Sequence, residues 1–180
     1  MSLRLLTLLA GTFLFCGAIC NAQSPAAPPP SQPVPNSTPK AGEAVIVLAR
    51  GAGYWDMGPV YRLMIYADGS VAYIGSRNVK MNGLAEGRIS REDVQRLVKA
   101  FDSIDYFSLL DEYSEKSGCP FYLADAANAY TTLKIGGKRK DVFHDSGCLA
   151  DGKSFASFPR GLAELENLID KVVKSDQWIK

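Results

Sequence analysis

The sequence predicts an α+β fold, an antiparallel sheet of about five to six strands with two α-helices packed on it. Two β-hairpin patterns occur, one around Asp68-Gly69 and one around Gly136-Gly137, and further strand patterns lie beside them in the sequence. Two helical patterns occur, over residues 90–101 and 159–175. The order strand, hairpin, irregular strand, helix, hairpin, helix is typical of an antiparallel sheet that carries its helices on one side.

The amino terminus indicates export. Residues 1–22 have the layout of a signal peptide, with a short basic start, an apolar run and small or polar residues before Gln23. We expect cleavage after Ala22, which would leave no transmembrane segment. Lipid attachment through Cys20 is the rival route, but the bulky Ile19 stands before it, where a small residue is needed. The protein is therefore expected to be periplasmic or secreted.

The mature chain is expected to consist of a linker and one domain. Residues 23–41 are rich in proline and predict an extended tether, and residues 42–180 are enough for a single globular domain. Loss of Arg4 with the leader leaves 19 basic and 19 acidic residues. A neutral domain is not steered towards nucleic acid or an anionic membrane, so we predict no nucleic-acid partner.

Residues 44–50 form a short β-branched run that predicts a doubly covered or central strand. The first hairpin follows over residues 60–75, where Asp68-Gly69 suits a two-residue type I′ turn. Such a turn sets Ile65 opposite Ala72. The expected core face then carries Tyr61, Leu63, Ile65, Ala72 and Ile74. The opposite face carries Arg62, Met64, Tyr66, Val71 and Tyr73.

That opposite face is too apolar for an ordinary wet surface, because Arg62 is its one charged residue. We favour partial cover by a helix or a loop. The alternative is an aromatic binding platform, since exposed apolar patches often mark partner sites. Its residues would be Arg62, Met64, Tyr66 and Tyr73.

The next pattern, residues 78–89, predicts an irregular strand interrupted by glycines. Ser90 then predicts a helix cap, because its hydroxyl can accept from the Asp93 amide. Apolar residues follow at helical spacing, and the dense run 104–113 is expected to dock on the same core.

The second hairpin spans residues 128–144. A two-residue turn at Gly136-Gly137 would oppose Lys134 and Arg139, a like-charge pair, so we favour a four-residue loop that pairs Lys134 with Asp141. Either register places Leu133, Ile135, Val142 and His144 on one face. The closing helix runs from about residue 159 to 175, and we expect Trp178 to fold back as a lid.

Two cysteines survive signal cleavage, Cys119 and Cys148, and an exported domain favours one disulfide between them. The single histidine, His144, argues against a histidine-based metal site, and no cofactor is expected. His144-Asp145-Ser146 resembles a catalytic triad only in letters, because adjacent strand residues point to opposite faces.

Several segments match a known pattern. They are Gly58-Pro59-Val60-Tyr61, the hairpin residues 65–75, Gly83, the capped helix, Tyr106-Phe107, Gly136-Gly137, Leu168-Ile169-Asp170 and Trp178, which cover most of residues 44–178. With them the domain resembles a bacterial family of small exported or lipoprotein domains of unknown function. Family members often carry a cysteine just before the Pro-x-Tyr unit, where this chain has Met57-Gly58. The resemblance implies a fold and an exported address, and it implies neither an activity nor a disulfide pattern.

We predict a non-catalytic exported domain that works through contacts with an envelope or extracellular protein or ligand. The prediction depends on the lack of a rigid nucleophile and base, a metal cluster and a phosphate loop in the sequence pattern. A second hypothesis is a hydrolase of envelope glycans or peptides that acts through Asp111, Glu112 or Asp125. A third is an inhibitor of a periplasmic enzyme.

Overall fold

The structure, a computed structural model, describes residues 44–53 and 56–180. The expected signal peptide (1–22), the alternative lipid site at Cys20 and the linker (23–41) lie outside the described residues. The elements are β1 (Ile46–Gly51), β2 (Val60–Ile65), β3 (Ser70–Arg77), β4 (Gly83–Arg88), α1 (Arg91–Ser103), the 3-10 helix η2 (Tyr106–Ser108), β5 (Glu112–Tyr113), β6 (Phe121–Tyr122), β7 (Asn128–Ile135), β8 (Lys138–Asp145), β9 (Cys148–Leu149), α2 (Leu162–Val173) and α3 (Asp176–Ile179).

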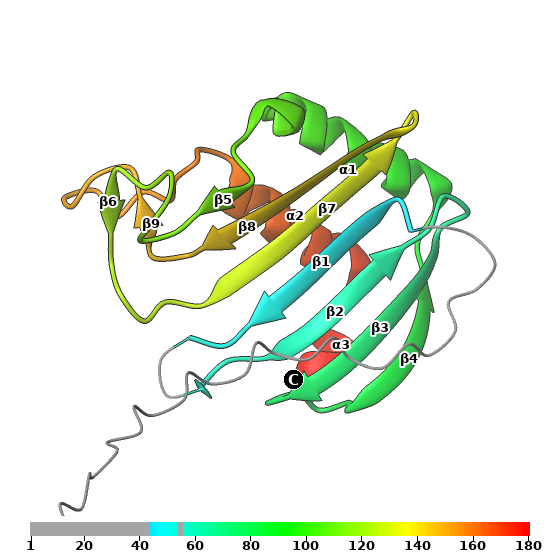
Figure 1. Cartoon of the computed structure of the whole chain (residues 1–180). Coiled ribbons are helices and arrows are strands. Elements are labelled where there is room, and N and C mark those ends of the chain that lie inside the picture. The colour runs from blue at the N-terminus through cyan, green and yellow to red at the C-terminus, as the bar shows by residue number, and fades with distance from the viewer. Residues whose placement is uncertain (1–43, 54–55) are drawn as a thin grey trace, which may run out of the picture. The chain divides into compact units, whose positions relative to one another are not determined.

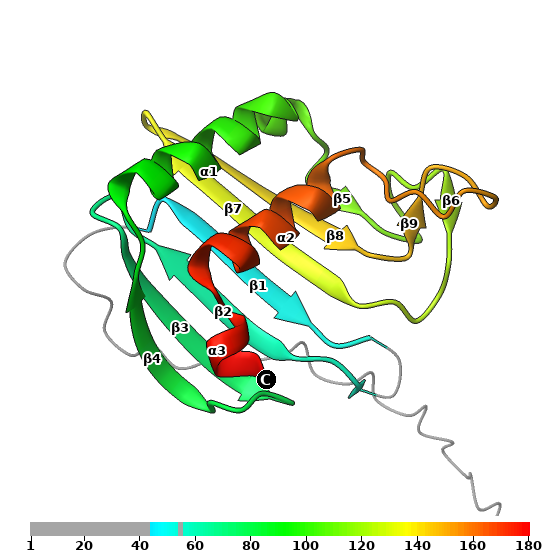
Figure 2. The same cartoon turned by 180° about the vertical axis from the view of Figure 1, so that it is seen from behind.

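The predicted α+β class is confirmed. A seven-stranded sheet has the order β4-β3-β2-β1-β7-β8-β5, and β6 pairs with β9 in a separate two-stranded sheet. All pairs in the large sheet are antiparallel except β5 with β8. The six longer strands of this sheet are those predicted, whereas β5, β6 and β9 have two residues each and carry no readable pattern. Figures 1 and 2 show α1, α2 and α3 on one face of the large sheet.

The first hairpin differs from its predicted register by one residue. Tyr66 pairs with Ser70, since its amide donates to the Ser70 carbonyl at 2.9 Å, and the loop is Ala67-Asp68-Gly69. Gly69 has a φ of 84°, which a three-residue loop needs at its last position. Ile65 therefore lies opposite Val71. The slip moves Val71 and Tyr73 to the core face and moves Ala72 and Ile74 to the opposite face.

The favoured four-residue loop of the second hairpin is wrong. β7 and β8 are joined by the two-residue turn Gly136-Gly137, and both glycines have positive φ, as a type I′ turn requires. Lys134 does lie opposite Arg139. The repulsion is relieved because Arg139 Nε donates to the Asp141 carboxylate at 2.8 Å. As predicted, Leu133, Val142 and His144 face the core, while Ile135 near the turn is 40% exposed.

The helices pack their apolar faces on the sheet. The Ser90 hydroxyl accepts from the Asp93 amide at 3.0 Å, which confirms the predicted cap of α1. Helix α2 begins at Leu162, later than predicted, because Gly161 before it has a left-handed φ of 83°. Trp178 in α3 folds back as predicted and stacks on Tyr73 with 4.9 Å between ring centroids. It closes the end of the core beneath β3 and β4.

Candidate functional site

Arg50 connects β1 to α2. Its Nη1 donates to Glu166 Oε2 at 3.1 Å, and its Nη2 donates to Asp170 Oδ2 at 3.0 Å. Glu166 and Asp170 lie four residues apart on α2, so both carboxylates project to the same side of the helix. Burial lowers the pKa of Arg50, but the two carboxylates more than offset this effect, and its pKa is raised. The three side chains form an ionised cluster between the sheet and the helix.

Asp170 has two further donors. The hydroxyls of Tyr61 and Ser175 donate to its Oδ1 at 2.6 and 2.8 Å. Burial and the nearby Asp170 charge raise the pKa of the Tyr61 phenol, so the phenol remains a donor. Strand β2, helix α2 and the chain after α2 are thereby held at one carboxylate.

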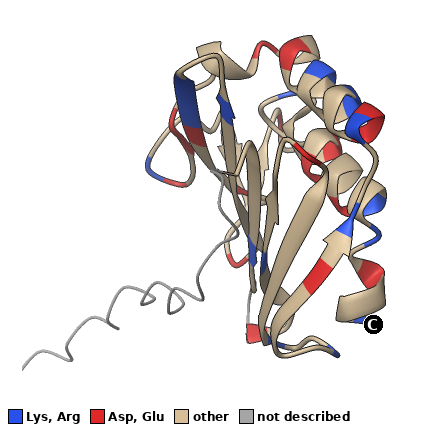
Figure 3. Cartoon of the chain, turned by 90° about the vertical axis from the view of Figure 1, so that its right-hand side faces the viewer, with Lys and Arg blue, Asp and Glu red and all other residues tan. Residues whose placement is uncertain are grey.

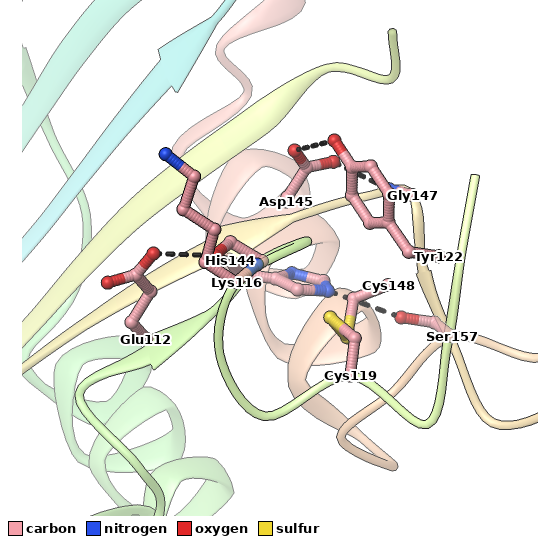
Figure 4. Close-up of a disulfide and its surroundings, with 10 residues drawn as sticks. Glu112, Lys116, Cys119, Tyr122, His144, Asp145, Gly147, Cys148 and Ser157 are labelled. Carbon is pink, nitrogen blue, oxygen red and sulfur yellow. Dashed lines mark hydrogen bonds between the residues drawn. A yellow bond between two sulfur atoms is a disulfide. The ribbon is translucent and has the colours of Figure 1, made fainter. Parts of the chain in front are cut away.

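His144 extends the cluster towards the small sheet. The side chains of His144 and Glu166 are both 1% exposed, and 3.0 Å separates His144 Nδ1 from Glu166 Oε1. A carboxylate oxygen accepts, so Nδ1 donates to Glu166, and in the neutral imidazole Nε2 is then the nitrogen with the lone pair. That Nε2 faces Ser157 Oγ at 3.5 Å. Figure 4 shows Ser157, His144 and the disulfide grouped together.

The predicted disulfide between Cys119 and Cys148 is present, with a sequence separation of 29. It connects the segment before β6 to β9, and Cys148 is fully buried in the core. Gly147, beside Cys148, has no room for a side chain, because an added Cβ would lie 1.9 Å from the Leu123 carbonyl oxygen. Asp145 accepts from the Tyr122 hydroxyl at 3.0 Å and from the Gly147 amide at 2.8 Å. These bonds fix the small sheet against the end of β8.

The opposite face of the large sheet carries no helix among the described residues, as the side view in Figure 3 shows. Two rows of directly opposed residues cross this face. One row is Leu84, Ile74, Arg62, Ala49, Tyr130 and Phe143. The other row is Glu86, Ala72, Met64, Val47, Thr132 and Asp141. We call these two rows the uncovered face.

Arg62 is the cation near the middle of the uncovered face. The part of the chain that the structure describes shows no ion pair for Arg62. Arg62 lies close enough to Tyr130 to act on its pKa, which burial and Asp141 raise and which Arg139 and Arg62 lower. Tyr130 is 41% exposed, and its neighbours Met64 and Phe143 are half-buried. The middle of the uncovered face is thus mainly apolar with Arg62 as its charged residue, and the carboxylates of Glu86 and Asp141 lie at the two ends of one row.

The structure separates the residues of the predicted binding platform. Arg62 and Met64 lie on the uncovered face, whereas Tyr73 is fully buried on the core side and Tyr66 is 6% exposed. The slipped register of the first hairpin is the reason that Tyr73 lies on the core side. The apolar residues that join Arg62 and Met64 come from strands β1, β3, β7 and β8, which a local reading of one hairpin cannot include.

The other sequence candidates do not converge. Asp111, Glu112 and Asp125 are all exposed, and Asp111 pairs with Lys140. His144 faces the core while Asp145 binds Tyr122, so the adjacent His-Asp-Ser letters form no triad, as predicted. The described residues hold no group of three or more His, Cys, Asp or Glu side chains able to bind a metal ion.

Sequence reasoning missed the partners of His144. Glu166 occupies a position of the buried stripe of α2, between Leu162 and Ile169, and is 1% exposed. A single carboxylate in the apolar stripe of a helix predicts a buried polar partner, because buried charges are paired. Ser157 gave no signal, since its approach to His144 depends on the path of the chain between β9 and α2.

The fold and site define a disulfide-linked α+β domain in which helices pack on one sheet face, and the other face carries none from residues 44–53 and 56–180. Among the described residues, no helix has the length and apolar character that a membrane crossing needs. Residues 45–173 match the family described as a domain of unknown function, DUF6438, and the chain belongs to this family. A comparison with curated proteins finds none that matches.

Proposed function

We propose that the protein is exported and serves as a binding domain whose uncovered face holds a segment of an envelope or extracellular protein. The observation that carries the proposal is the composition of this face. Isolated apolar residues are normal on a protein surface, but the two rows place an apolar residue on each of six neighbouring strands, with Glu86 and Asp141 at the two ends of one row. The helices already cover the other side of the sheet, so the core does not account for these side chains.

The chemistry of the face indicates the kind of segment. Met64, Val47 and Ile74 offer apolar contact, Tyr130 offers an aromatic ring, and Arg62 offers a charge-assisted donor. The partner segment should therefore present apolar side chains around one carboxylate. Tyr and Arg are also the residue types that most often dominate binding energy at interfaces.

The test places a photoactivatable phenylalanine at position 130 and, as the control, at position 99 on α1. Illumination in cells that naturally make the protein, followed by peptide mapping, should give from position 130 one partner peptide that contains Asp or Glu. Arg62→Glu should abolish that adduct, while Arg91→Glu on α1 should preserve it. Adducts to residues 24–40 of the same chain, to a second copy of the chain, or equally from position 99 would contradict the proposal.

Export has its own measurement. The intact mass of protein isolated from its natural host should equal that of residues 23–180 with one disulfide. Retention of residues 1–22 would contradict export, and a diacylglyceryl mass on Cys20 would show lipid anchoring instead.

A further inference from the structure

A hydroxyl, an imidazole and a carboxylate stand in line on the helix-covered side of the sheet. Ser157 Oγ lies 3.5 Å from His144 Nε2, and His144 Nδ1 lies 3.0 Å from Glu166 Oε1. The three residues come from the segment before α2, from β8 and from α2 itself. This is the order of groups that activates a serine nucleophile, and hydrogen bonds of this kind are often long before a substrate binds.

The tautomer of His144 suits that role. Glu166 Oε2 is held by Arg50 Nη1 at 3.1 Å, which leaves Oε1 to accept from Nδ1. In the neutral imidazole Nε2 is then the unprotonated nitrogen, and it is the one that faces Ser157. Glu166 satisfies only Nδ1, and Ser157 is the partner that the structure gives to the buried Nε2.

Ser157 is the accessible end of this line. His144 and Glu166 are buried, whereas Ser157 is half-buried and follows an exposed loop, residues 150–156. Asp151 fixes this loop by accepting from the amides of Lys153 and Ser154 at 2.7 and 2.6 Å. The pKa of Asp151 is lowered by these bonds, so its carboxylate remains an acceptor.

A backbone donor accompanies the hydroxyl. Ser157 forms an isolated antiparallel bridge with Leu149. The Ala150 amide donates to the Ala156 carbonyl at 2.8 Å, and the Phe158 amide donates to the Cys148 carbonyl at 3.0 Å. These bonds lie on either side of Leu149 and Ser157, which do not bond to each other, so the Ser157 amide points away from Leu149. The amide of the nucleophile itself is one of the donors that stabilise the oxyanion in serine proteases.

We propose that Ser157 is the nucleophile of an acyl-transfer site for small carboxylic esters, with His144 as general base and Glu166 as a positioning residue. Ser157 Oγ attacks the ester carbonyl while its proton passes to His144 Nε2. The tetrahedral intermediate expels the alcohol, which takes that proton, and leaves an acyl ester on Ser157. Water then attacks this ester, His144 accepts its proton, and the carboxylic acid leaves as the proton returns to Ser157. The site is separate from the uncovered face, so the two proposals stand or fall independently.

The test treats the full chain, with its disulfide intact, with a fluorophosphonate probe and with 4-nitrophenyl acetate. Intact mass and peptide mapping should show one phosphonyl adduct, on Ser157, and ester cleavage should begin with a burst of nitrophenol. Ser157→Ala should abolish the adduct and the burst, and Ser146→Ala, at an exposed serine nearby, should leave both unchanged.

The positioning role has a separate readout. Glu166→Gln should slow labelling of Ser157 by at least about tenfold, because the imidazolium that forms during attack loses its counter-charge. Circular dichroism will show whether this variant and His144→Gln fold. If neither variant folds, labelling of Ser157 in the wild-type chain still tests the proposal. A folded wild type without an adduct on Ser157, or an unchanged labelling rate in a folded Glu166→Gln or His144→Gln variant, would overturn the inference.

Discussion

At the scale of single residues, Ser90 controls the start of α1. Its hydroxyl accepts from the Asp93 amide, one of the four amides that a helix start leaves without an intrahelical acceptor. Ser90→Ala should therefore lower the free energy of unfolding by about 1 kcal/mol in urea denaturation. Ser103→Ala at the other end of α1 is the control and should change it by less than about 0.5 kcal/mol. Equal losses in both variants would show that the cap is not the cause.

The buried phenol of Tyr106 should make the stability of the fold depend on pH in the alkaline range. Its hydroxyl donates to the Thr131 carbonyl at 2.6 Å, and burial and the nearby Asp141 raise the pKa of the phenol. The unfolded phenol has a pKa near 10, so this contribution to stability is complete below about pH 10 and is lost as the pH rises towards the folded pKa.

The free energy of unfolding should accordingly fall as the pH rises above about 10. Tyr106→Phe should make this fall shallower, while Tyr130→Phe, at a ring that is 41% exposed, should change its slope less. Urea denaturation at a series of pH values measures both variants. An unchanged slope in Tyr106→Phe would contradict the assigned cause.

At the scale of elements, Arg50 decides how α2 sits on the sheet. Arg50→Met would leave the buried Glu166 and the part-buried Asp170 without their shared cation. Removal of one partner from a buried ion pair costs about 3–5 kcal/mol, and we expect the lower end because the Arg50 side chain is 17% exposed. Arg62→Met on the uncovered face is the matched control and should cost less than about 0.5 kcal/mol. A loss in Arg50→Met as small as in this control would contradict the role of the cluster.

The disulfide acts on the segment between β5 and β9. A cross-link with a separation of 29 residues restricts the unfolded chain and should contribute about 3–4 kcal/mol. The double variant Cys119→Ala, Cys148→Ala should lose this amount in urea denaturation, and reduced wild type should match it. Equal stability of oxidised and reduced wild type would show that native contacts alone hold the small sheet.

At the scale of the whole molecule, local patterns predicted the elements better than their pairing. The capped helix, both hairpins and the disulfide follow from short stretches of sequence. Asp68-Gly69 suits a two-residue turn and also the end of a three-residue loop, and both faces of that hairpin are apolar, so hydrophobicity could not select the register. In the second hairpin, the like-charge argument between Lys134 and Arg139 did not include the bond within β8 from Arg139 to Asp141, two residues further along the strand. The line of Ser157, His144 and Glu166 depends on three elements that meet only in the folded chain.

The seven residues after the family match, 174–180, show how far the domain extends. The family match ends at residue 173, yet Trp178 is only 7% exposed, stacks on Tyr73, and accepts the Met81 amide on its carbonyl at 2.9 Å. A chain that ends at residue 173 would uncover Tyr73 at one end of the core, and loss of a buried Trp side chain costs about 3–5 kcal/mol. Urea denaturation should show that loss for the truncated chain and for Trp178→Ala, and a smaller one for Trp178→Phe, which keeps a stacking ring. If the truncated chain unfolds at the same urea concentration as the full chain, then the core closes without α3, and the domain ends where the family match ends.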